Sequence, residues 1–307
     1  MRAVQVRRFG GPEVLQVVEV PAPDRPGPGE LLVEVEAAGL GPWDLGTIAG
    51  RMGNFGFPFT PGAELAGQVL RVGPGVTGFA PGHAVWAYPG LVGCWQEVAL
   101  VPAATASRRP AAVTGIDAGG MPVCAVTAYQ GLVDLLDLKP SETLLVTGGG
   151  GALGSQVVQL GGWIGARVIA TASAEDHDWM GELGASDALD YGGPWLQRLR
   201  DLAYDGVDAV FDTVGGDVMV EASYGVRDGG RIVTSVTRRD DPRLDRGVTW
   251  RFFGSQGTTA RLTTLAGLVD AASLVPTTGL VFPLEDVRDA VAAQLAPHRG
   301  KVVLTLG

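Results

Sequence analysis

The chain has 307 residues, of which 46% are hydrophobic and 18% are charged. This length suggests two domains with substantial cores, and the composition is that of an ordinary globular protein. The formal net charge is −10, whereas non-specific binding to nucleic acid needs a basic surface. Nucleic acid is therefore not an expected partner.

The sequence contains no segment typical of membrane insertion or export. The first residues, MRAVQVRRFGGPEV, predict a strand and a turn, without the apolar core of a signal peptide. No uninterrupted apolar run reaches about 18 residues, the length that predicts a membrane helix. We expect a cytoplasmic protein with no membrane partner, in which Cys94 and Cys124 are buried free thiols.

The content of ligating residues argues against a zinc site. Such a site needs three or four cysteine, histidine or carboxylate ligands. The chain has two cysteines and three histidines, and no two of these lie at the spacing of a ligand motif. We expect no bound metal, and we expect His83, which follows Pro81 and Gly82, to be a turn residue.

Residues 1 to about 119 alternate short apolar strands with glycine and proline turns. This pattern predicts a β-rich, partly open barrel. The expected strands are residues 3–8, 15–20, 31–39, 66–73, 83–88 and 95–101.

From about Met121 the pattern changes to alternating helices and strands. A helix over 125–138 is expected to end at Lys139 and Pro140. The alternation that follows predicts a doubly wound parallel sheet, which binds its ligand at the carboxyl ends of the strands. The expected strands are 143–148, 166–172, 187–191, 208–214 and 230–236, and the helices lie around 155–163, 176–183, 194–203 and 217–226.

The last part of the chain departs from this alternation. It contains one more strand over 248–257, a helix over about 258–272, a segment around Pro283, another helix and a final strand over 301–307. We expect these last elements to return to the first domain. The predicted division is residues 1–119 with 258–307 as one domain, and 120–257 as an inserted nucleotide-binding domain.

The strongest motif is the glycine turn that follows the buried strand at Leu144 to Thr147. Gly149, Gly151 and Gly154 have the G-x-G-x-x-G spacing of a dinucleotide site, and an apolar helix pattern follows them. Glycine permits a tight turn and a close approach of backbone to pyrophosphate. The helix N-terminus then offers N–H groups to the phosphates. A glycine-rich turn without a ligand is the alternative.

The end of the next strand favours NADPH over NADH. An acidic residue about 20 positions after the first glycines usually binds the ribose hydroxyls in NAD sites. Ser173 lies there instead, and it can donate to a 2′-phosphate. Tyr191 could donate a second hydroxyl, or it could be an aromatic side chain packed at a strand end. The following segment, Glu175 to Asp178, is acidic and works against this preference.

Together these stretches resemble the zinc-free quinone oxidoreductase branch of the medium-chain dehydrogenase/reductase superfamily. The resemblance covers nearly the whole chain and includes FTPGAELAGQVLRVGPGV, TAYQGL, ETLLVTGGGGALGSQVVQL, LGASDALDY, FDTVGG, GGRIVTSV and HRGKVVL. It implies a GroES-like barrel, a Rossmann domain, NADPH and hydride transfer to a quinone or an activated alkene. Zinc-dependent relatives have Gly-His-Glu where this chain has Gly62, Ala63 and Glu64.

The resemblance also implies which residues contact the cofactor. Thr127 matches the position beside the nicotinamide, and Ser173 and Tyr191 match the 2′-phosphate contacts. The pyrophosphate turn corresponds to Gly151, Ala152, Leu153 and Gly154; the adenosine or ribose contacts to Thr213, Val214, Ser235, Val236 and Arg238; and the strand at the nicotinamide end to Phe252, Phe253 and Gly254.

Three departures from the family pattern concern the pocket and the phosphate site. Gly41 replaces an asparagine near the nicotinamide, Gly46 replaces a tyrosine, and a lysine that pairs with the 2′-phosphate falls at Asp176 or His177. The two glycines suggest a roomier pocket for a bulky or aromatic substrate.

We expect Trp43, Arg51 and Tyr88 to line the pocket, with Arg51 holding an anionic group of the substrate. Thr127 and Tyr88 are the proton-donor candidates. Structural roles are the alternatives for all of these residues, and Asp44 is expected to brace its loop.

The predicted function is an NADPH-dependent reductase of quinones or α,β-unsaturated carbonyl compounds. Two alternatives remain open: a tailoring enoyl or ketide reductase of a biosynthetic pathway, and a non-catalytic NADPH-binding protein. The family also implies a homodimer in which the strand VTWRFFGS pairs between subunits.

Overall fold

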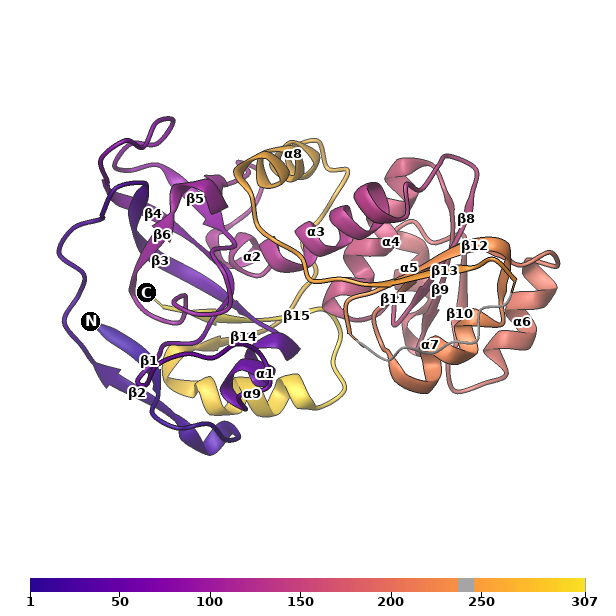
Figure 1. Ribbon diagram of the computed structural model, residues 1–307, viewed down its shortest axis with the longest axis horizontal. Helices are drawn as coiled ribbons and strands as arrows, with labels where there is room; N and C mark the ends of the chain where they lie inside the picture. Colours follow the sequence, from indigo (N-terminus) through magenta and orange to yellow (C-terminus); the bar gives the residue numbers. More distant parts are fainter. Residues whose placement is uncertain (237–245, 307) are drawn as a thin grey trace. The chain divides into compact units, whose positions relative to one another are not determined.

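The computed structural model describes residues 1–236 and 246–306. The chain forms two compact units, Met1–Val126 with Gln256–Gly307 and Thr127–Ser255 (Figure 1). The boundaries expected from the sequence lay somewhat outside the second unit on both sides. The chain passes from the first unit to the second within one helix, α3 (Pro122–Tyr129), so no composition change marks that crossing.

The first unit is built on a sheet in which the end of the chain joins its beginning. The final strand β15 (Lys301–Thr305) pairs antiparallel with β3 (Glu30–Leu40). The full order in this sheet is β14 (Thr278–Pro283), β15, β3, β4 (Leu65–Val72), β5 (Ala84–Ala87) and β7 (Ala106–Arg108). Strand β6 (Val98–Pro102) also pairs with β3. Strands β1 (Arg2–Val6) and β2 (Leu15–Glu19) form a separate two-stranded sheet.

The core of this unit consists of side chains from these strands and from the helices beside them. Trp86 and Trp95 are fully buried, and their indole N–H groups donate to Ser107 Oγ and to the Gly39 carbonyl. Both tryptophans are therefore core residues. The helices are α1 (Pro42–Ile48), α2 (Gly115–Gly119), α8 (Thr259–Asp270) and α9 (Val287–Leu295), and α1 and α9 lie beside each other (Figure 1).

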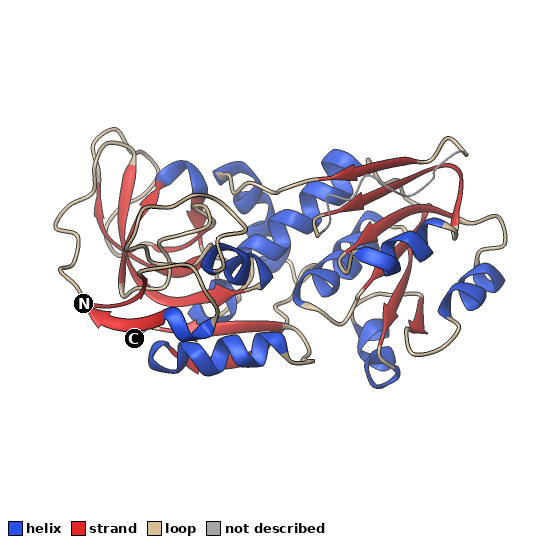
Figure 2. Ribbon diagram, turned by 60° about the horizontal axis from the view of Figure 1, so that its bottom comes forward, coloured by secondary structure: helices blue, strands red, loops and turns tan. Residues whose placement is uncertain are grey.

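The second unit contains the predicted parallel sheet with helices around it (Figure 2). Its strand order is β10 (Asp187–Asp190), β9 (Arg167–Ala172), β8 (Thr143–Thr147), β11 (Val207–Asp212), β12 (Val226–Thr234) and β13 (Thr249–Phe252). The inner strands β8, β9 and β11 are apolar and almost entirely buried, as parallel strands are, whereas the edge strand β13 is exposed or half-buried. The helices are α4 (Ala152–Ile164), α5 (His177–Glu182), α6 (Trp195–Leu202) and α7 (Gly216–Ser223).

The helix expected over 125–138 differs in start and in form. It begins at Pro122 as α3, and residues Gln130–Leu135 continue as a π-helical segment. Gly131 lies in this segment against the Phe211 ring, where an added Cβ would come within 2.2 Å of a ring carbon. A glycine thus allows the close approach of helix to sheet at this point.

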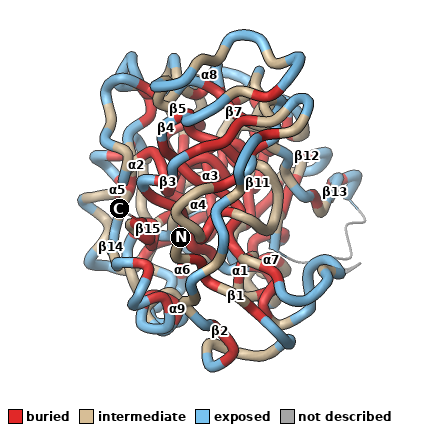
Figure 3. Tube along the Cα trace, turned by 90° about the vertical axis from the view of Figure 1, so that its left-hand side faces the viewer, coloured by how far each residue is buried: buried red, intermediate tan, exposed pale blue. Residues whose placement is uncertain are grey.

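Burial follows the strands, and exposure follows the turns between them (Figure 3). Cys94 and Cys124 are both buried and unbridged, as expected. Within the described residues, no helix combines the length and the apolar character that crossing a bilayer requires.

Candidate functional site

The glycine turn after β8 has no room for side chains at two of its positions. A Cβ on Gly154 would lie 2.1 Å from the Gly148 carbonyl oxygen, and one on Gly149 would lie 2.7 Å from Met180 Sδ. Gly148 has a φ of +69°, a conformation that favours glycine. Gly149 N–H also donates to the Thr171 carbonyl at 2.7 Å, which fixes the turn against β9. The turn is therefore a bare backbone surface.

Helix α4 starts directly from this turn. Gly151 is its N-cap residue, and no side chain caps the helix among the described residues. The first N–H groups of a helix have no partner within the helix, and the helix dipole favours an anion there. Gly151 is exposed, and Ala152 and Leu153 are half-buried. The bare turn and the uncapped helix start together fit a pyrophosphate group.

A buried carboxylate next to the turn joins three strand ends. Thr147, Asp212 and Thr234 lie in register at the carboxyl ends of β8, β11 and β12. Both threonine hydroxyls donate to Asp212 at 2.7 Å, and the N–H groups of Val214 and Gly215 donate to it as well. This cluster was not predicted from the sequence, although an aspartate at the end of a buried strand was a usable signal.

Asp212 also shapes the loop expected to contact adenosine or ribose. Thr213 Oγ1 donates to the Thr147 carbonyl at 2.6 Å, so the loop is attached to the strand that begins the glycine turn. Val214 is 45% exposed and is available to a ligand. Ser235 is half-buried, Val236 is exposed, and Arg238 lies outside the described residues.

The structure places an acidic side chain beside the expected 2′-phosphate contacts. Ser173 Oγ donates to Asp176 Oδ2 at 2.9 Å. The same carboxylate oxygen lies 2.9 Å from where a Cβ of Gly150 would be, so it reaches the glycine turn. Tyr191 is 61% exposed and follows β10, the neighbouring strand. Ser173 and Tyr191 thus lie at the ends of the neighbouring strands β9 and β10, and the Asp176 carboxylate lies beside Ser173.

The residues expected near the nicotinamide include a close pair of hydroxyls. Thr127 Oγ1 and Ser255 Oγ are 2.6 Å apart, and Thr127 is 5% exposed. Phe253 is buried and meets Phe211 edge-to-face, with ring centroids 6.1 Å apart. Phe252 is half-buried, and nothing lies within 4 Å of a Cβ placed on Gly254. Ser255 was not among the predicted site residues.

The three expected pocket residues have different surroundings in the first unit. Arg51 is exposed in the loop after α1 and lines a cavity whose walls include neither Trp43 nor Tyr88. Trp43 is half-buried, and its ring lies 4.3 Å from Lys301 Nζ. Tyr88 is 9% exposed and packs against Gly257, where a Cβ would come 2.3 Å from the Tyr88 carbonyl oxygen.

The extra room expected at Gly41 and Gly46 is not present. A Cβ on Gly41 would lie 2.4 Å from the Trp43 ring, and a Cβ on Gly46 would lie 2.9 Å from Met52 Sδ. Neighbouring side chains therefore fill the space that the missing asparagine and tyrosine would otherwise use. The expectation of a roomier pocket at these two glycines was wrong.

The first unit also buries a cluster of three ionisable side chains, Asp44, Glu64 and Lys301. Lys301 Nζ lies 2.6 Å from Glu64 Oε1, and Glu64 Oε2 accepts from Val123 N–H at 2.7 Å. Asp44 accepts from Gly41 N–H at 2.8 Å, which braces the start of α1 as expected. All three side chains are almost completely buried.

The protonation of this cluster follows from its burial. Removal from water raises the pKa of Asp44 to about 8, although Lys301 and the Gly41 N–H act in the opposite direction. For Lys301, burial is the largest influence and opposes the charge, but Glu64 and the other acidic groups nearby together outweigh it, so the pKa is raised. Asp44 is therefore mainly protonated at neutral pH, beside a Glu64–Lys301 ion pair.

Within the part of the chain that the structure describes, no group of three or more histidine, cysteine or carboxylate side chains could hold a metal ion. Glu64, which follows the position of the histidine in zinc-dependent relatives, contacts an ammonium group instead. His83 Nδ1 accepts from Ala80 N–H at 3.0 Å within a turn, as expected.

Comparison with known proteins identifies the family. Residues 27–135 match the alcohol dehydrogenase GroES-like domain, and residues 183–304 match the zinc-binding dehydrogenase domain. A chloroplastic quinone oxidoreductase, QR1 of Triphysaria versicolor, is 33% identical over 221 residues, 68% of this chain and 67% of that protein. The chain belongs to the medium-chain dehydrogenase/reductase family. It is a quinone oxidoreductase-like member, and the predicted fold class is confirmed.

Other relatives of this dehydrogenase/reductase are diverse. The synaptic vesicle membrane protein VAT-1 homolog of Rattus norvegicus is 32% identical over 241 residues, which are 76% of this chain but 59% of that protein. The chain thus spans about three fifths of that relative. Polyketide synthase GfsB of Streptomyces halstedii is 33% identical over 296 residues, 91% of this chain and 5% of that protein.

Solved structures of this family match the whole chain. An NAD-dependent alcohol dehydrogenase superposes with a TM-score of 0.92 at 31% identity, and the match covers 100% of both chains. A mycobacterial protein complexed with NADPH superposes with a TM-score of 0.88 at 28% identity over 99% of both chains. Binding of a pyridine nucleotide is thus supported by the family and by the geometry of the glycine turn.

Proposed function

We propose that this chain is an NADPH-dependent reductase that passes hydride to a quinone or an α,β-unsaturated carbonyl compound. The observation that carries the proposal is the bare glycine turn at the start of α4. Gly149 and Gly154 leave no space for a Cβ, and α4 begins without a side-chain cap. This arrangement is the one that a dinucleotide pyrophosphate requires.

The bound cofactor would supply the hydride, and the residues of the chain would hold and orient the reactants. The α4 N-terminus would bind the pyrophosphate. Asp212 would hold the Thr213 to Gly215 loop beside it through the hydrogen bonds described above. With NADPH bound, the Ser173 hydroxyl would turn its single proton from Asp176 to the 2′-phosphate, which supports NADPH, while the Asp176 carboxylate limits how strongly NADPH is preferred.

The hydroxyl pair of Thr127 and Ser255 is the best-placed polar group for the reacting end. A short hydroxyl–hydroxyl contact of 2.6 Å can transmit a proton or orient a carbonyl oxygen. Thr127 is preferred over Tyr88 as the proton donor, because the Thr127 hydroxyl lies 2.6 Å from the hydroxyl of Ser255. The substrate is a small molecule, and no particular bulk is proposed, since Trp43 and Met52 fill the space beside Gly41 and Gly46.

Turnover of NADPH with a substrate panel tests this function. The purified chain is mixed with NADPH and with quinones or enones of increasing size, and the absorbance of the reduced nicotinamide is followed. We expect oxidation that depends on both the chain and the acceptor. Binding of NADPH without oxidation by any acceptor would instead favour the non-catalytic alternative.

A second candidate function is enoyl reduction on a biosynthetic intermediate. It is favoured by the match to a polyketide synthase, which covers 91% of this chain. An enoyl thioester in the same assay separates the two functions. Reduction of the thioester much faster than of any quinone would support the biosynthetic role, and the reverse would support quinone reduction.

A further inference from the structure

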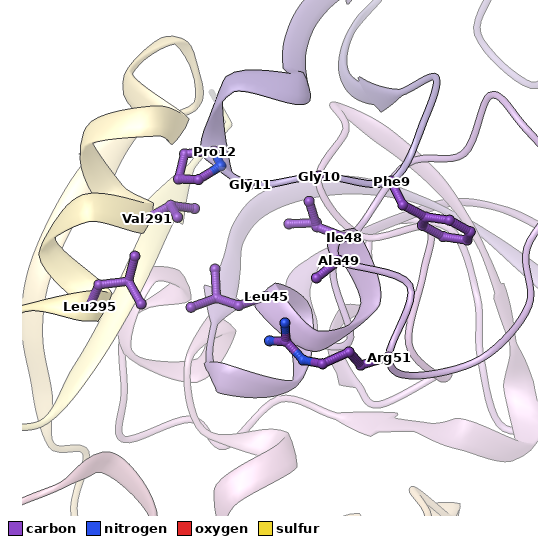
Figure 4. A pocket seen from close by; sticks show the side chains of 10 residues that line it. All are labelled: Phe9, Gly10, Gly11, Pro12, Leu45, Ile48, Ala49, Arg51, Val291 and Leu295. Atoms are coloured by element: carbon purple, nitrogen blue, oxygen red, sulfur yellow. The ribbon is translucent and has the colours of Figure 1, made fainter.

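The first unit contains a cavity that none of the expected cofactor-binding residues lines. Its volume is about 470 Å³, within the range of small-molecule sites, about 300–1,000 Å³. Three segments form its walls: the loop Phe9–Pro12, helix α1 with the residues Ala49 and Arg51 that follow it, and helix α9 (Figure 4). All of them belong to Met1–Val126 with Gln256–Gly307, so the cavity lies within one compact unit.

The three walls are tied to one another. Gly10 N–H donates to the Ile48 carbonyl at 3.1 Å, which joins the loop to α1. The Arg288 guanidinium of α9 donates to the Leu15 carbonyl at 2.8 Å, which holds α9 to the segment after the loop. The Phe9 ring also lies against Gly50, at 2.8 Å from a Cβ placed there. The cavity is therefore a built feature of the unit.

The cavity is lined mainly by apolar side chains, some of which are buried and some of which are exposed to solvent. Ile48 and Val291 are almost completely buried, whereas Phe9 is 37% and Leu295 is 66% exposed. Apolar side chains that gather at the edge of a cavity are typical of a binding surface, while single exposed ones are not informative. An apolar ligand would cover Phe9 and Leu295 on binding.

Arg51 is the one charged side chain that lines this cavity. Its guanidinium group is turned toward Leu45 (Figure 4), and among the described residues no carboxylate lies within ion-pair distance of it. The nearby Glu13 is not a lining residue. Its carboxylate accepts from Gly11 N–H, and this hydrogen bond is the main reason that its pKa is lowered. The guanidinium thus remains available to an anion in a chain with a net charge of −10.

We propose that this cavity binds an apolar carboxylate, with the hydrocarbon part against Ile48 and Val291 and the carboxylate on Arg51. An apolar cavity with one cation in its lining matches the two ends of such a molecule. The ligand could be a separate small molecule or the carboxylate-bearing end of a substrate. The site does not depend on the proposed reaction, because no cofactor residue lines it.

Calorimetric titration of the full chain with octanoate, without any nucleotide, tests the proposal. We expect saturable binding of octanoate and much weaker binding of octanol, which has the same chain but no charge. Arg51→Gln should weaken octanoate binding by about tenfold and leave octanol unchanged, since a charge-assisted contact is lost. Arg7→Gln, at an exposed arginine that does not line the cavity, is the matched control.

A second pair of variants tests the position of the site. Leu295 is exposed, so Leu295→Glu should fold normally and should repel the carboxylate, whereas Leu295→Gln should bind octanoate nearly as well as the natural chain. No binding of octanoate, or equal binding by the natural chain and Arg51→Gln, would overturn the proposal. If octanoate competes with an uncharged enone that the chain reduces, the site belongs to the substrate. If octanoate does not compete with that enone, the site belongs to a separate ligand.

Discussion

We expect Asp176 to influence which nicotinamide cofactor this chain accepts, because its carboxylate lies beside Ser173. Its Oδ2 atom accepts from Ser173 Oγ at 2.9 Å and reaches the glycine turn near Gly150. A carboxylate at that place repels a 2′-phosphate but can accept from ribose hydroxyls. The Ser173 hydroxyl and the Asp176 carboxylate therefore act in opposite directions on the preference for NADPH.

Replacing Asp176 with asparagine should strengthen the preference for NADPH. Asparagine keeps an acceptor for Ser173 but removes the negative charge, so the ratio of NADPH to NADH affinity should rise by about fivefold to tenfold. Titration with both nucleotides measures this ratio. Asp178→Asn, an exposed carboxylate on the same segment, controls for the change in net charge. An unchanged ratio in Asp176→Asn would mean that the carboxylate does not face the phosphate.

The burial of Asp44 leads us to expect that the stability of the folded chain depends on pH. The pKa of Asp44 is about 8 in the folded chain, mainly because of burial, against an ordinary value of 3.8. Between these values the folded state holds a proton that the unfolded state has released. Its contribution to stability is complete below about pH 4 and is lost as the pH rises to about 8, with a slope of up to about 1.4 kcal/mol per pH unit.

Asp44→Asn should remove this contribution to the pH dependence. Urea unfolding between about pH 5 and pH 8 should show a free energy of unfolding that falls less with pH in the variant than in the natural chain. The asparagine side chain can still accept from Gly41 N–H, so α1 should keep its start. Identical pH profiles for the two chains would show that Asp44 is ionised throughout.

At the scale of secondary-structure elements, the ends of three parallel strands meet at Asp212. The two threonines and the loop N–H groups all donate to this one carboxylate. The elements that would contact the cofactor are thus held together below the surface, without a direct role for Asp212 in binding. We regard Asp212 as a positioning residue.

Asp212→Asn should disturb both the loop and the sheet. Gly215 N–H donates to both carboxylate oxygens, so the amide NH₂ would meet a donor on either side, and the free energy of unfolding should fall by about 2–4 kcal/mol. NADPH binding should weaken as well, because Val214 N–H and Gly215 N–H lose their acceptor. Unfolding and nucleotide titration measure the two effects, with Asp217→Asn, an exposed carboxylate on α7, as the control. Unchanged stability would contradict this role of Asp212.

The regular elements of the second unit could be predicted because strand, turn and helix signals agree there. Each expected strand overlaps one of β8 to β13, and the glycine turn lies where the motif placed it. The short elements α1, α2 and β7 were not predicted, since a few residues carry little periodicity. Helix α1 has only a weak helix pattern, and its start is defined by Pro42 in the first turn and by Asp44, which accepts from Gly41 N–H.

Contacts made by residues distant in sequence could not be predicted from local patterns. The ion pair of Glu64 and Lys301 joins the residue before β4 to the final strand β15, and the Thr127–Ser255 pair joins the first and last residues of the second unit. The placement of Trp43 over Gly41 depends on a side-chain conformation that sequence does not reveal. For this reason the cofactor turn was predicted better than the substrate pocket.

At the scale of the whole molecule, the open question is how many copies of the chain associate. Strand β13 is the edge of the six-stranded sheet, and an edge strand offers unpaired backbone groups to another strand. We expect two copies to pair through β13 around a two-fold axis. Light scattering should give about twice the chain mass of 31.7 kDa at micromolar concentration. A single-chain mass over the whole concentration range would contradict the dimer.

The central claim is that the glycine turn before α4 holds a nicotinamide dinucleotide. It is tested most directly by titrating the natural chain, Gly151→Ala and Gly154→Ala with NADPH. A Cβ at position 151 would lie no closer than 3.5 Å to the protein, whereas one at 154 would lie 2.1 Å from a backbone oxygen. We predict that the natural chain binds NADPH, that Gly154→Ala loses binding by at least about a hundredfold while remaining folded, and that Gly151→Ala is less affected. Equal NADPH affinity in the natural chain and Gly154→Ala, or no binding of NADPH or NADH to the natural chain, would contradict the account.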